Sequence, residues 1–234
     1  MKKEKCTAIV VAAGQGKRMG GQVQKQFLEI GGNPILYYCL DCFQKSVVID
    51  EIILVTAQDK IEFCKKRIVE PYKLDKVTKI VPGGKERKDS VMEGLKSCPD
   101  ADYVFIHDGA RPFITQKILE RAMEAVRDHK ACVVGMPVKD TIKLLDGDGF
   151  VRDTPNRRQT WLVQTPQCFA YALICRAYKE LGEERANMVT DDAMAVEISG
   201  LAQVKMVMGD YTNIKITTPE DLKTAEVFLS SEIY

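Results

Sequence analysis

The chain has 234 residues, which is enough for one large α/β domain with a small appendage but cramped for two full domains. Its 34 Lys and Arg residues balance 33 Asp and Glu residues, which argues against a nonspecific nucleic-acid binder and requires any anion site to be local. The apolar runs are too short to span a membrane, and the charged start leads into a strand instead of a signal peptide, so we expect a cytoplasmic protein without a membrane partner.

The first predicted strand, residues 8–11, runs into a glycine-rich turn that carries several cations. Gly14 and Gly16 let backbone N–H groups approach an anion, while Arg18 and Lys25 supply positive charge. The spacing lacks the first glycine and the hydroxyl residue of a Walker loop, and it lacks the third glycine of a dinucleotide-binding loop. We therefore predict a different kind of polyphosphate-binding loop, with a basic surface turn as the alternative.

Six apolar runs that resemble buried strands alternate with helical patterns along most of the chain. The predicted strands cover residues 8–11, 52–55, 77–81, 104–106, 133–138 and 204–208. The predicted helices run from 33–34 to about 45, around 91–95, from 115 onward, and from 219 towards 230. This alternation predicts an α/β fold with a doubly wound, mostly parallel sheet of the Rossmann-like type, whose ligand crevice lies at the carboxyl ends of the strands.

Residues 139 to about 163 interrupt the alternation of strands and helices. The run 146–149, Asp-Gly-Asp-Gly, separates two short alternating segments and predicts a hairpin in a projecting β-arm. The arm is too small to be stable alone, so we expect it to pair with a second copy of the chain, with an ordinary surface hairpin as the alternative. The whole chain, residues 1–234, is thus predicted to be a single domain that contains this arm.

Two loops after predicted strands have residues suited to a nucleotide site. Gly83 begins a turn that opens a helix, and Ser90 follows it, so backbone amides and a hydroxyl could hold a nucleotide there. Asp108 ends a strand, where one carboxylate suits Mg²⁺ that takes its other ligands from phosphates and water. The alternatives are a plain turn at Gly83 and an Asx turn in which Arg111 pins Asp108. His107 is expected to be a packed strand-end residue instead of a base.

Three further polar segments, residues 164–167, 190–193 and 213–219, are interpreted as loops of the same site. Taken alone, Thr190 or Asp191 could be a helix N-cap, and Lys215 a solvated lysine. Nucleotidyl transfer needs no protein nucleophile, because alignment and charge neutralisation supply most of the catalysis. The cations of these loops and a metal at Asp108 would therefore suffice.

The eight cysteines are expected to be reduced thiols of a cytosolic protein. Cys39 and Cys42 form a C-x-x-C pair without a second pair and without a nearby histidine. We expect this pair to pack within a helix and not to bind a metal or act as a redox centre.

Eight short motifs occur in order from one end of the chain to the other, at residues 12–19, 25–28, 83–90, 107–112, 137–143, 164–167, 190–193 and 213–215. Together they resemble the 2-C-methyl-D-erythritol 4-phosphate cytidylyltransferase family of the non-mevalonate isoprenoid pathway. The resemblance implies transfer of CMP from CTP to 2-C-methyl-D-erythritol 4-phosphate, giving 4-diphosphocytidyl-2-C-methyl-D-erythritol and pyrophosphate.

The same resemblance implies roles for individual residues. It assigns transition-state stabilisation to Arg18 and Lys25, and it assigns the metal, Mg²⁺ or another divalent cation, to Asp108. It assigns substrate positioning to Arg157, Lys215 and Thr141, and nucleotide contacts to Ala12, Ala13, Gly14, Gly83 and Ser90. It also implies a homodimer that exchanges the arm, so that Arg157 and Thr141 serve the neighbouring subunit. Arg158 is an alternative to Arg157, although the spacing to Trp161 favours Arg157.

Two other functions remain open on the sequence. One is a ribitol 5-phosphate cytidylyltransferase, a sister activity with nearly the same loops; the segments 138–143 and 190–193 favour the erythritol substrate. The other is a nucleotide-sensing module without turnover, which would not need Arg18, Lys25 and Lys215 together.

Overall fold

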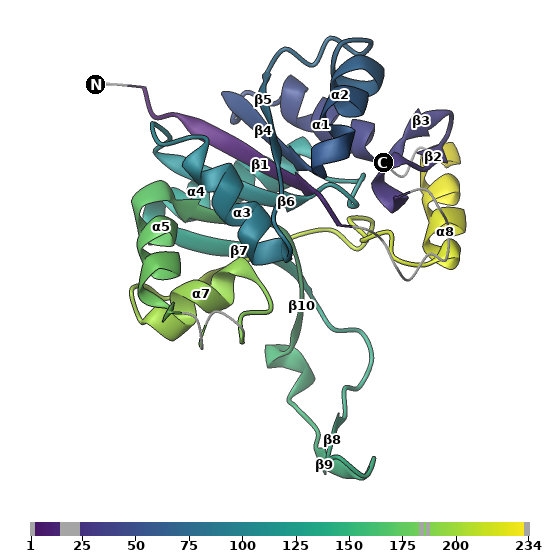
Figure 1. Ribbon diagram of the computed structural model, residues 1–234. Coiled ribbons are helices and arrows are strands. Elements are labelled where there is room, and N and C mark those ends of the chain that lie inside the picture. Colours follow the sequence, from purple (N-terminus) through teal and green to yellow (C-terminus); the bar gives the residue numbers. More distant parts are fainter. Residues whose placement is uncertain (1–2, 15–23, 183–184, 186–187, 232–234) are drawn as a thin grey trace.

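The computed structural model describes residues 3–14, 24–182, 185 and 188–231, and a seven-stranded sheet forms its centre (Figure 1). In order across the sheet the strands are β11 (Lys205–Met208), β7 (Ala131–Pro137), β10 (Trp161–Ala170), β6 (Tyr103–Asp108), β1 (Cys6–Ala12), β4 (Glu51–Thr56) and β5 (Val77–Pro82). Strand β10 runs antiparallel to both of its neighbours, and the other pairings are parallel. The predicted α/β fold with a mostly parallel sheet is therefore confirmed.

Helices cover both faces of the sheet. One face packs against α1 (Ile35–Lys45), α2 (Ile61–Cys64) and α4 (Gln116–His129), and the other packs against α3 (Arg87–Lys96), α5 (Tyr171–Glu180) and α7 (Asp192–Ser199). Helix α8 (Pro219–Ser230) contacts the small hairpin of β2 (Glu29–Ile30) and β3 (Asn33–Pro34). Short turns of other helix types are η2 (Lys25–Phe27), η3 (Gln58–Lys60), η4 (Lys65–Val69) and η5 (Arg157–Gln159).

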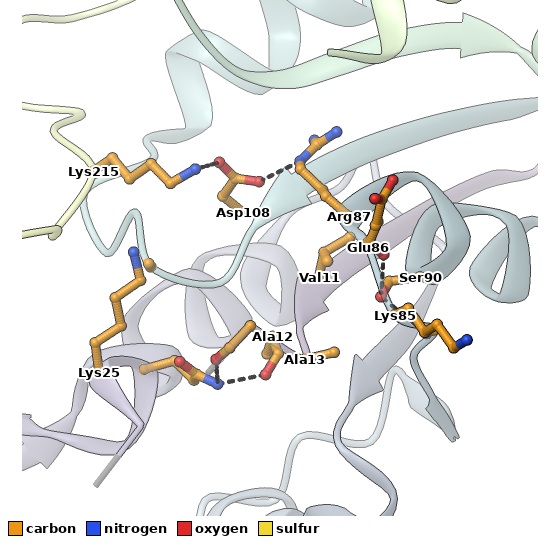
Figure 2. A pocket seen from close by; sticks show the side chains of 14 residues that line it. Val11, Ala12, Ala13, Lys25, Lys85, Glu86, Arg87, Ser90, Asp108 and Lys215 are labelled. Atoms are coloured by element: carbon orange, nitrogen blue, oxygen red, sulfur yellow. Dashed lines mark hydrogen bonds and ion pairs between the residues drawn. The ribbon is translucent and has the colours of Figure 1, made fainter. Parts of the chain in front are cut away.

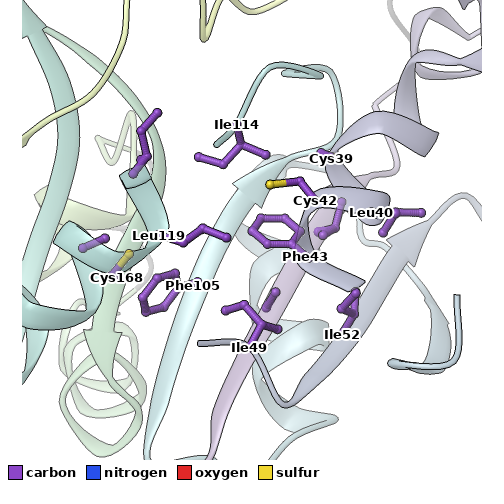
Figure 3. Close-up of a cluster of buried hydrophobic side chains, with 14 of the residues drawn as sticks. Cys39, Leu40, Cys42, Phe43, Ile49, Ile52, Phe105, Ile114, Leu119 and Cys168 are labelled. Atoms are coloured by element: carbon purple, nitrogen blue, oxygen red, sulfur yellow. The ribbon is translucent and has the colours of Figure 1, made fainter. Parts of the chain in front are cut away.

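The two larger clusters of buried side chains lie on opposite faces of the sheet, and successive residues of the central strands point to them in turn. Ala8 of β1 points to the cluster under α1 and α4, whereas Ile9 points to the cluster under α3 and α5. In the first cluster, Phe43 of α1, Phe105 of β6 and Leu119 of α4 are fully buried (Figure 3). Burial on both faces explains why the strands read as continuous apolar runs in the sequence.

Strand β10 was not expected, because residues 164–167 were predicted to be a loop. The prediction was wrong: Gln164, Thr165 and Gln167 are buried within β10. Pro166 hides this strand in the sequence, because a proline cannot donate a ladder hydrogen bond and therefore argues against a central strand. The pairing with β7 shifts register between Val163 and Gln167, and this irregularity accommodates the proline.

The C-x-x-C pair packs within helix α1, as expected. Cys39 and Cys42 are both buried and free, and burial raises the pKa of Cys42 to about 12, which disfavours the reactive thiolate. Within the described residues, no group of three or more His, Cys, Asp or Glu side chains could hold a metal ion. Among the same residues, no helix has both the length and the apolar character to cross a membrane.

A hairpin of β8 (Leu144–Leu145) and β9 (Val151–Asp153) extends away from the sheet on the segment between β7 and β10 (Figure 1). The Asp146 carboxylate closes its turn by accepting hydrogen bonds from the backbone N–H groups of Asp148 and Phe150. The apolar side chains at its tip are largely exposed, with Phe150 72% and Val151 58% accessible. Strand β10 begins at Trp161, so residues 161–163 of the predicted arm belong to the sheet.

Candidate functional site

A cavity of about 590 Å³ lies where β1, β5 and β6 end (Figure 2). Three loops that follow these strands form most of its wall, together with the start of η2 and one lysine of the segment before α8. The lining residues are Val11, Ala12, Ala13, Gly14, Lys25, Gln26, Gly84, Lys85, Glu86, Arg87, Ser90, Asp108, Ala110 and Lys215. The cavity thus lies in the crevice that the strand order predicts.

Gln26 connects the end of β1 to Lys25. Its side-chain amide donates hydrogen bonds to the backbone oxygens of Ala12, at 2.5 Å, and Gly14, at 3.1 Å, and the residue is only 2% exposed. These bonds hold η2 against the first loop, so that Lys25 lines the cavity. Arg18 lies outside the described residues. Gln26 belongs to a motif seen in the sequence, but nothing there indicated this bridging role.

The loop after β5 is shaped by its glycines and by Ser90. The Ser90 hydroxyl accepts a hydrogen bond from Gly84 N–H and donates one to the Glu86 carbonyl, both at 3.2 Å. A Cβ on Gly83 would lie 2.5 Å from the Ala13 Cβ, so only glycine lets the two loops approach this closely. Gly84 and Ser90 line the cavity, whereas Gly83 does not line it but packs closely against Ala13 and Ser90, which do.

Asp108 is held between two cations on the cavity wall. The Lys215 Nζ lies 2.7 Å from Oδ2, and the Arg87 Nε lies 3.0 Å from Oδ1 (Figure 2). Burial alone would raise the pKa of Asp108, but Arg87 and Lys215 outweigh it and hold that pKa well below its ordinary value. Arg111, which the Asx-turn alternative paired with Asp108, directs its guanidinium to the carbonyls of Asn213 and Val163 instead.

His107 is a packed strand-end residue, as expected. Its Nε2 lies 3.1 Å from the Arg111 carbonyl, which can only accept, so Nε2 carries the proton. Its Nδ1 then accepts from the Thr165 hydroxyl at 3.0 Å, and that hydroxyl accepts from Asp108 N–H. Complete burial lowers the pKa of His107 to about 4, so the ring stays neutral and fixes the loop that carries Asp108.

The buried His107 predicts a pH-dependent stability. Its pKa falls from 6.5 in the unfolded chain to about 4 in the folded one, so the unfolded chain binds the extra proton between these values. This histidine alone should therefore lower the free energy of unfolding by about 3 kcal/mol as the pH drops from 6.5 to 4. Urea unfolding across this range should show a shallower fall for His107→Gln than for the control His129→Gln, whose ring is exposed. Equal slopes in the two variants would contradict the prediction.

The start of α7 contains a cap and a buried charge. Asp191 is the N-cap of α7, since its carboxylate accepts from Met194 N–H at 2.9 Å, and the cap interpretation is thus confirmed. Asp192, the next residue, is completely buried and lies 2.8 Å from the Arg87 guanidinium. Nothing in the local sequence around Arg87 or around Asp192 indicates that the two side chains meet.

Thr141 and Arg157 lie on the arm and do not line the cavity of their own subunit among the residues described. Arg157 donates to the Lys139 carbonyl at 3.3 Å, while the Asn156 side chain caps η5 by accepting a hydrogen bond from the backbone N–H of Arg158. The structure therefore brings together Lys25, Lys215 and Asp108 but leaves both arm residues apart from them.

The donors at the cavity suit a magnesium ion. Mg²⁺ usually takes one or two protein carboxylates and fills its remaining positions with water and substrate phosphates. Asp108 is such a carboxylate, it lines the cavity, and its low pKa keeps it ionised. A divalent cation there would share or replace the contacts that Lys215 and Arg87 now make.

Comparisons with known proteins agree over nearly the whole chain. Residues 6–231 match the family model of 2-C-methyl-D-erythritol 4-phosphate cytidylyltransferase. Relatives with that name include one from Lachnoclostridium phytofermentans, 48% identical over 97% of both chains, and one from Clostridium botulinum strain 657, 49% identical over 96% of this chain and 97% of the relative.

Solved structures give the same result. The 4-diphosphocytidyl-2C-methyl-D-erythritol synthase of Anaerococcus prevotii superposes with a TM-score of 0.86 at 38% identity, covering 97% of this chain and 96% of that one. The 2-C-methyl-D-erythritol 4-phosphate cytidylyltransferase of Thermus thermophilus gives 0.76 at 30% identity, covering 97% and 99%. The resemblance seen in the sequence is confirmed, and the chain belongs to the 2-C-methyl-D-erythritol 4-phosphate cytidylyltransferase family.

Proposed function

We propose that the cavity at the ends of β1, β5 and β6 is where this cytidylyltransferase transfers CMP from CTP to 2-C-methyl-D-erythritol 4-phosphate. The observation that carries this proposal is that Lys25 and Lys215, far apart in the sequence, line one cavity together with the ionised Asp108. Glycine-rich backbone and three lysines, Lys25, Lys85 and Lys215, line this one crevice and suit a triphosphate, which needs both N–H donors and positive charge.

The chemistry proposed here uses no covalent intermediate on the protein. An oxygen of the acceptor phosphate attacks the α-phosphorus of CTP in line with the leaving pyrophosphate, and the bond from the α-phosphorus to the bridging oxygen breaks. Negative charge grows on the non-bridging and leaving oxygens, where Arg18 and Lys25 would stabilise it. Lys215 would hold the acceptor phosphate, while Ala12, Ala13, Gly14, Gly83 and Ser90 would form the nucleotide pocket.

Asp108 would hold Mg²⁺ or another divalent cation in the working enzyme. When bound, such a cation neutralises phosphate charge and orients the triphosphate. The protein's own contribution is to keep the Asp108 carboxylate ionised and fixed at the cavity wall.

The arm is proposed to complete the site of a second subunit. Leu145, Phe150 and Val151 leave 55%, 72% and 58% of their surface exposed, which suits burial against another copy of the chain. The homodimer would bring the partner subunit's Arg157 and the partner subunit's Thr141 to this cavity. This exchange explains why both positioning residues lie outside the cavity of their own chain.

Pyrophosphate release tests the proposed reaction. We expect release that requires CTP, a divalent cation and 2-C-methyl-D-erythritol 4-phosphate, with kcat/KM at least about tenfold higher than with ribitol 5-phosphate. Preference for ribitol 5-phosphate would contradict the acceptor assignment. CTP binding without pyrophosphate release from either acceptor would favour the nucleotide-sensing alternative.

A further inference from the structure

A chain of alternating charges runs from the cavity into the interior. Lys215 contacts one oxygen of Asp108, Arg87 contacts the other at 3.0 Å, and the far end of the same guanidinium lies 2.8 Å from Asp192. Tyr178 completes the chain by donating its hydroxyl hydrogen to Asp192 at 2.6 Å. These five residues, from the loop before α8, β6, α3, α7 and α5, are named here the charge chain.

The two cations of the charge chain are more exposed than its two carboxylates, and Asp192 is the most buried of the four charged side chains. The Lys215 side chain is 36% exposed and the Arg87 side chain 28%, whereas Asp108 is 10% exposed and Asp192 is fully buried. A buried carboxylate is costly unless it is paired and hydrogen-bonded, and Arg87 with Tyr178 provides both for Asp192. Asp192, at the inner end of the charge chain, is therefore held in place, whereas Lys215, at the outer end, can exchange partners with solvent and ligands.

We propose that Arg87, anchored by Asp192 and Tyr178, is a positioning residue that fixes the Asp108 carboxylate for the divalent cation. This inference rests on the proposed function, in which Asp108 holds that cation. A guanidinium is planar and can contact two carboxylates through separate nitrogens in a fixed geometry, whereas an ammonium group is a point charge on a flexible stem. When Lys215 turns to a phosphate, Arg87 remains and keeps Asp108 oriented.

Asp192 has a second effect in this arrangement. An arginine without a partner beside a triphosphate would itself bind phosphate, because guanidinium groups match phosphate oxygens well. The Asp192 carboxylate draws the terminal nitrogen of Arg87 inward, so that Nε faces Asp108. Mutating a residue that holds a metal ligand in place usually lowers metal affinity or activity about 10- to 100-fold.

Binding of Mn²⁺, followed by electron paramagnetic resonance with CTP and without acceptor, tests the inference apart from turnover. We expect Asp192→Asn to weaken Mn²⁺ binding about tenfold or more, and Tyr178→Phe to weaken it less but in the same direction. Arg87→Lys should behave like Asp192→Asn, because it keeps the charge but loses the bridge.

Lys5→Gln is the matched control. Lys5 forms a partly buried ion pair with Glu51 at 2.8 Å, but it precedes β1 and so lies at the opposite end of that strand from the cavity. We expect this variant to lose thermal stability without any change in Mn²⁺ affinity. If Asp192→Asn and Arg87→Lys also lose thermal stability without a change in Mn²⁺ affinity, the charge chain only holds helices together and the inference is overturned.

Asp108→Asn separates this inference from the proposed function. If Asp108→Asn leaves Mn²⁺ affinity unchanged, the metal assignment itself fails; if only Asp108→Asn weakens binding, the positioning role alone fails. Should Asp192→Asn not fold, Tyr178→Phe decides, since it removes one hydroxyl and keeps the ion pair. Unchanged Mn²⁺ affinity in a folded Tyr178→Phe variant would then count against the inference.

Discussion

Lys25→Ala is expected to lower kcat by about a hundredfold or more, with little change in the KM for CTP. Lys25 lines the cavity at the start of η2, and Gln26 fixes that turn to the backbone of the first loop. A preorganised ammonium group of this kind stabilises charge that grows only in the transition state, so its loss should appear in kcat. Steady-state pyrophosphate release at varied CTP measures both constants.

Lys85→Ala provides the control for this experiment. Lys85 also lines the cavity, on the loop after β5, and we assign it no role in the reaction. Its removal tests whether any lost positive charge in the cavity lowers kcat. An equal fall in kcat for both variants would contradict a specific role for Lys25, and an unchanged kcat in Lys25→Ala would remove it from the reaction altogether.

Arg157→Ala is expected to raise the KM for 2-C-methyl-D-erythritol 4-phosphate by between about tenfold and a hundredfold. A hydrogen bond to a charged group contributes about 1.5–3 kcal/mol, and about 1.4 kcal/mol corresponds to a tenfold change. The KM for CTP should change little, because Arg157 is assigned to the acceptor. Arg158→Ala is the matched control from the same turn, since the two arginines are adjacent in η5. A larger effect of Arg158→Ala would reverse the choice between them.

Mixing the Arg157→Ala chain with the Lys25→Ala chain tests the exchange of arms between subunits. If the partner subunit's Arg157 completes each site, one of the two sites in a mixed dimer receives both native side chains, and activity partly returns. If Arg157 served its own subunit, no site in a mixed dimer would contain both. Verified mixed dimers without recovered activity would therefore contradict arm exchange.

Local patterns predicted most of the fold because they follow from burial and chain stiffness. Continuous apolar runs identified buried strands such as β1 and β4, and a capping box of Thr218 and Asp221 with Pro219 fixes the start of α8 where it was expected. Strand β10 was not predicted because Pro166 indicates the end of a strand. Only the register shift against β7 accommodates this proline. That compensation depends on tertiary structure.

The candidate site was partly predictable for a similar reason. Parallel strands end at one edge of the sheet, so residues at or just after those ends, such as Gly14, Ser90 and Asp108, were expected to lie near one another. The partners of each charge were not predictable, because Arg87 and Asp192 lie far apart in the sequence and each resembles an ordinary helix-start residue. Their pairing follows from how α3 and α7 pack on the same face of the sheet.

The reversed direction of β10 has a consequence for how proteins of this architecture can diverge. Because β10 is antiparallel to β7, the segment between them, which contains the arm, leaves and rejoins the sheet at the same edge. The cavity lies at this edge too. A change in the length or in the surface residues of this segment requires no rearrangement of β7 or β10. Evolution can therefore change how subunits recognise each other while the framework around the nucleotide stays the same.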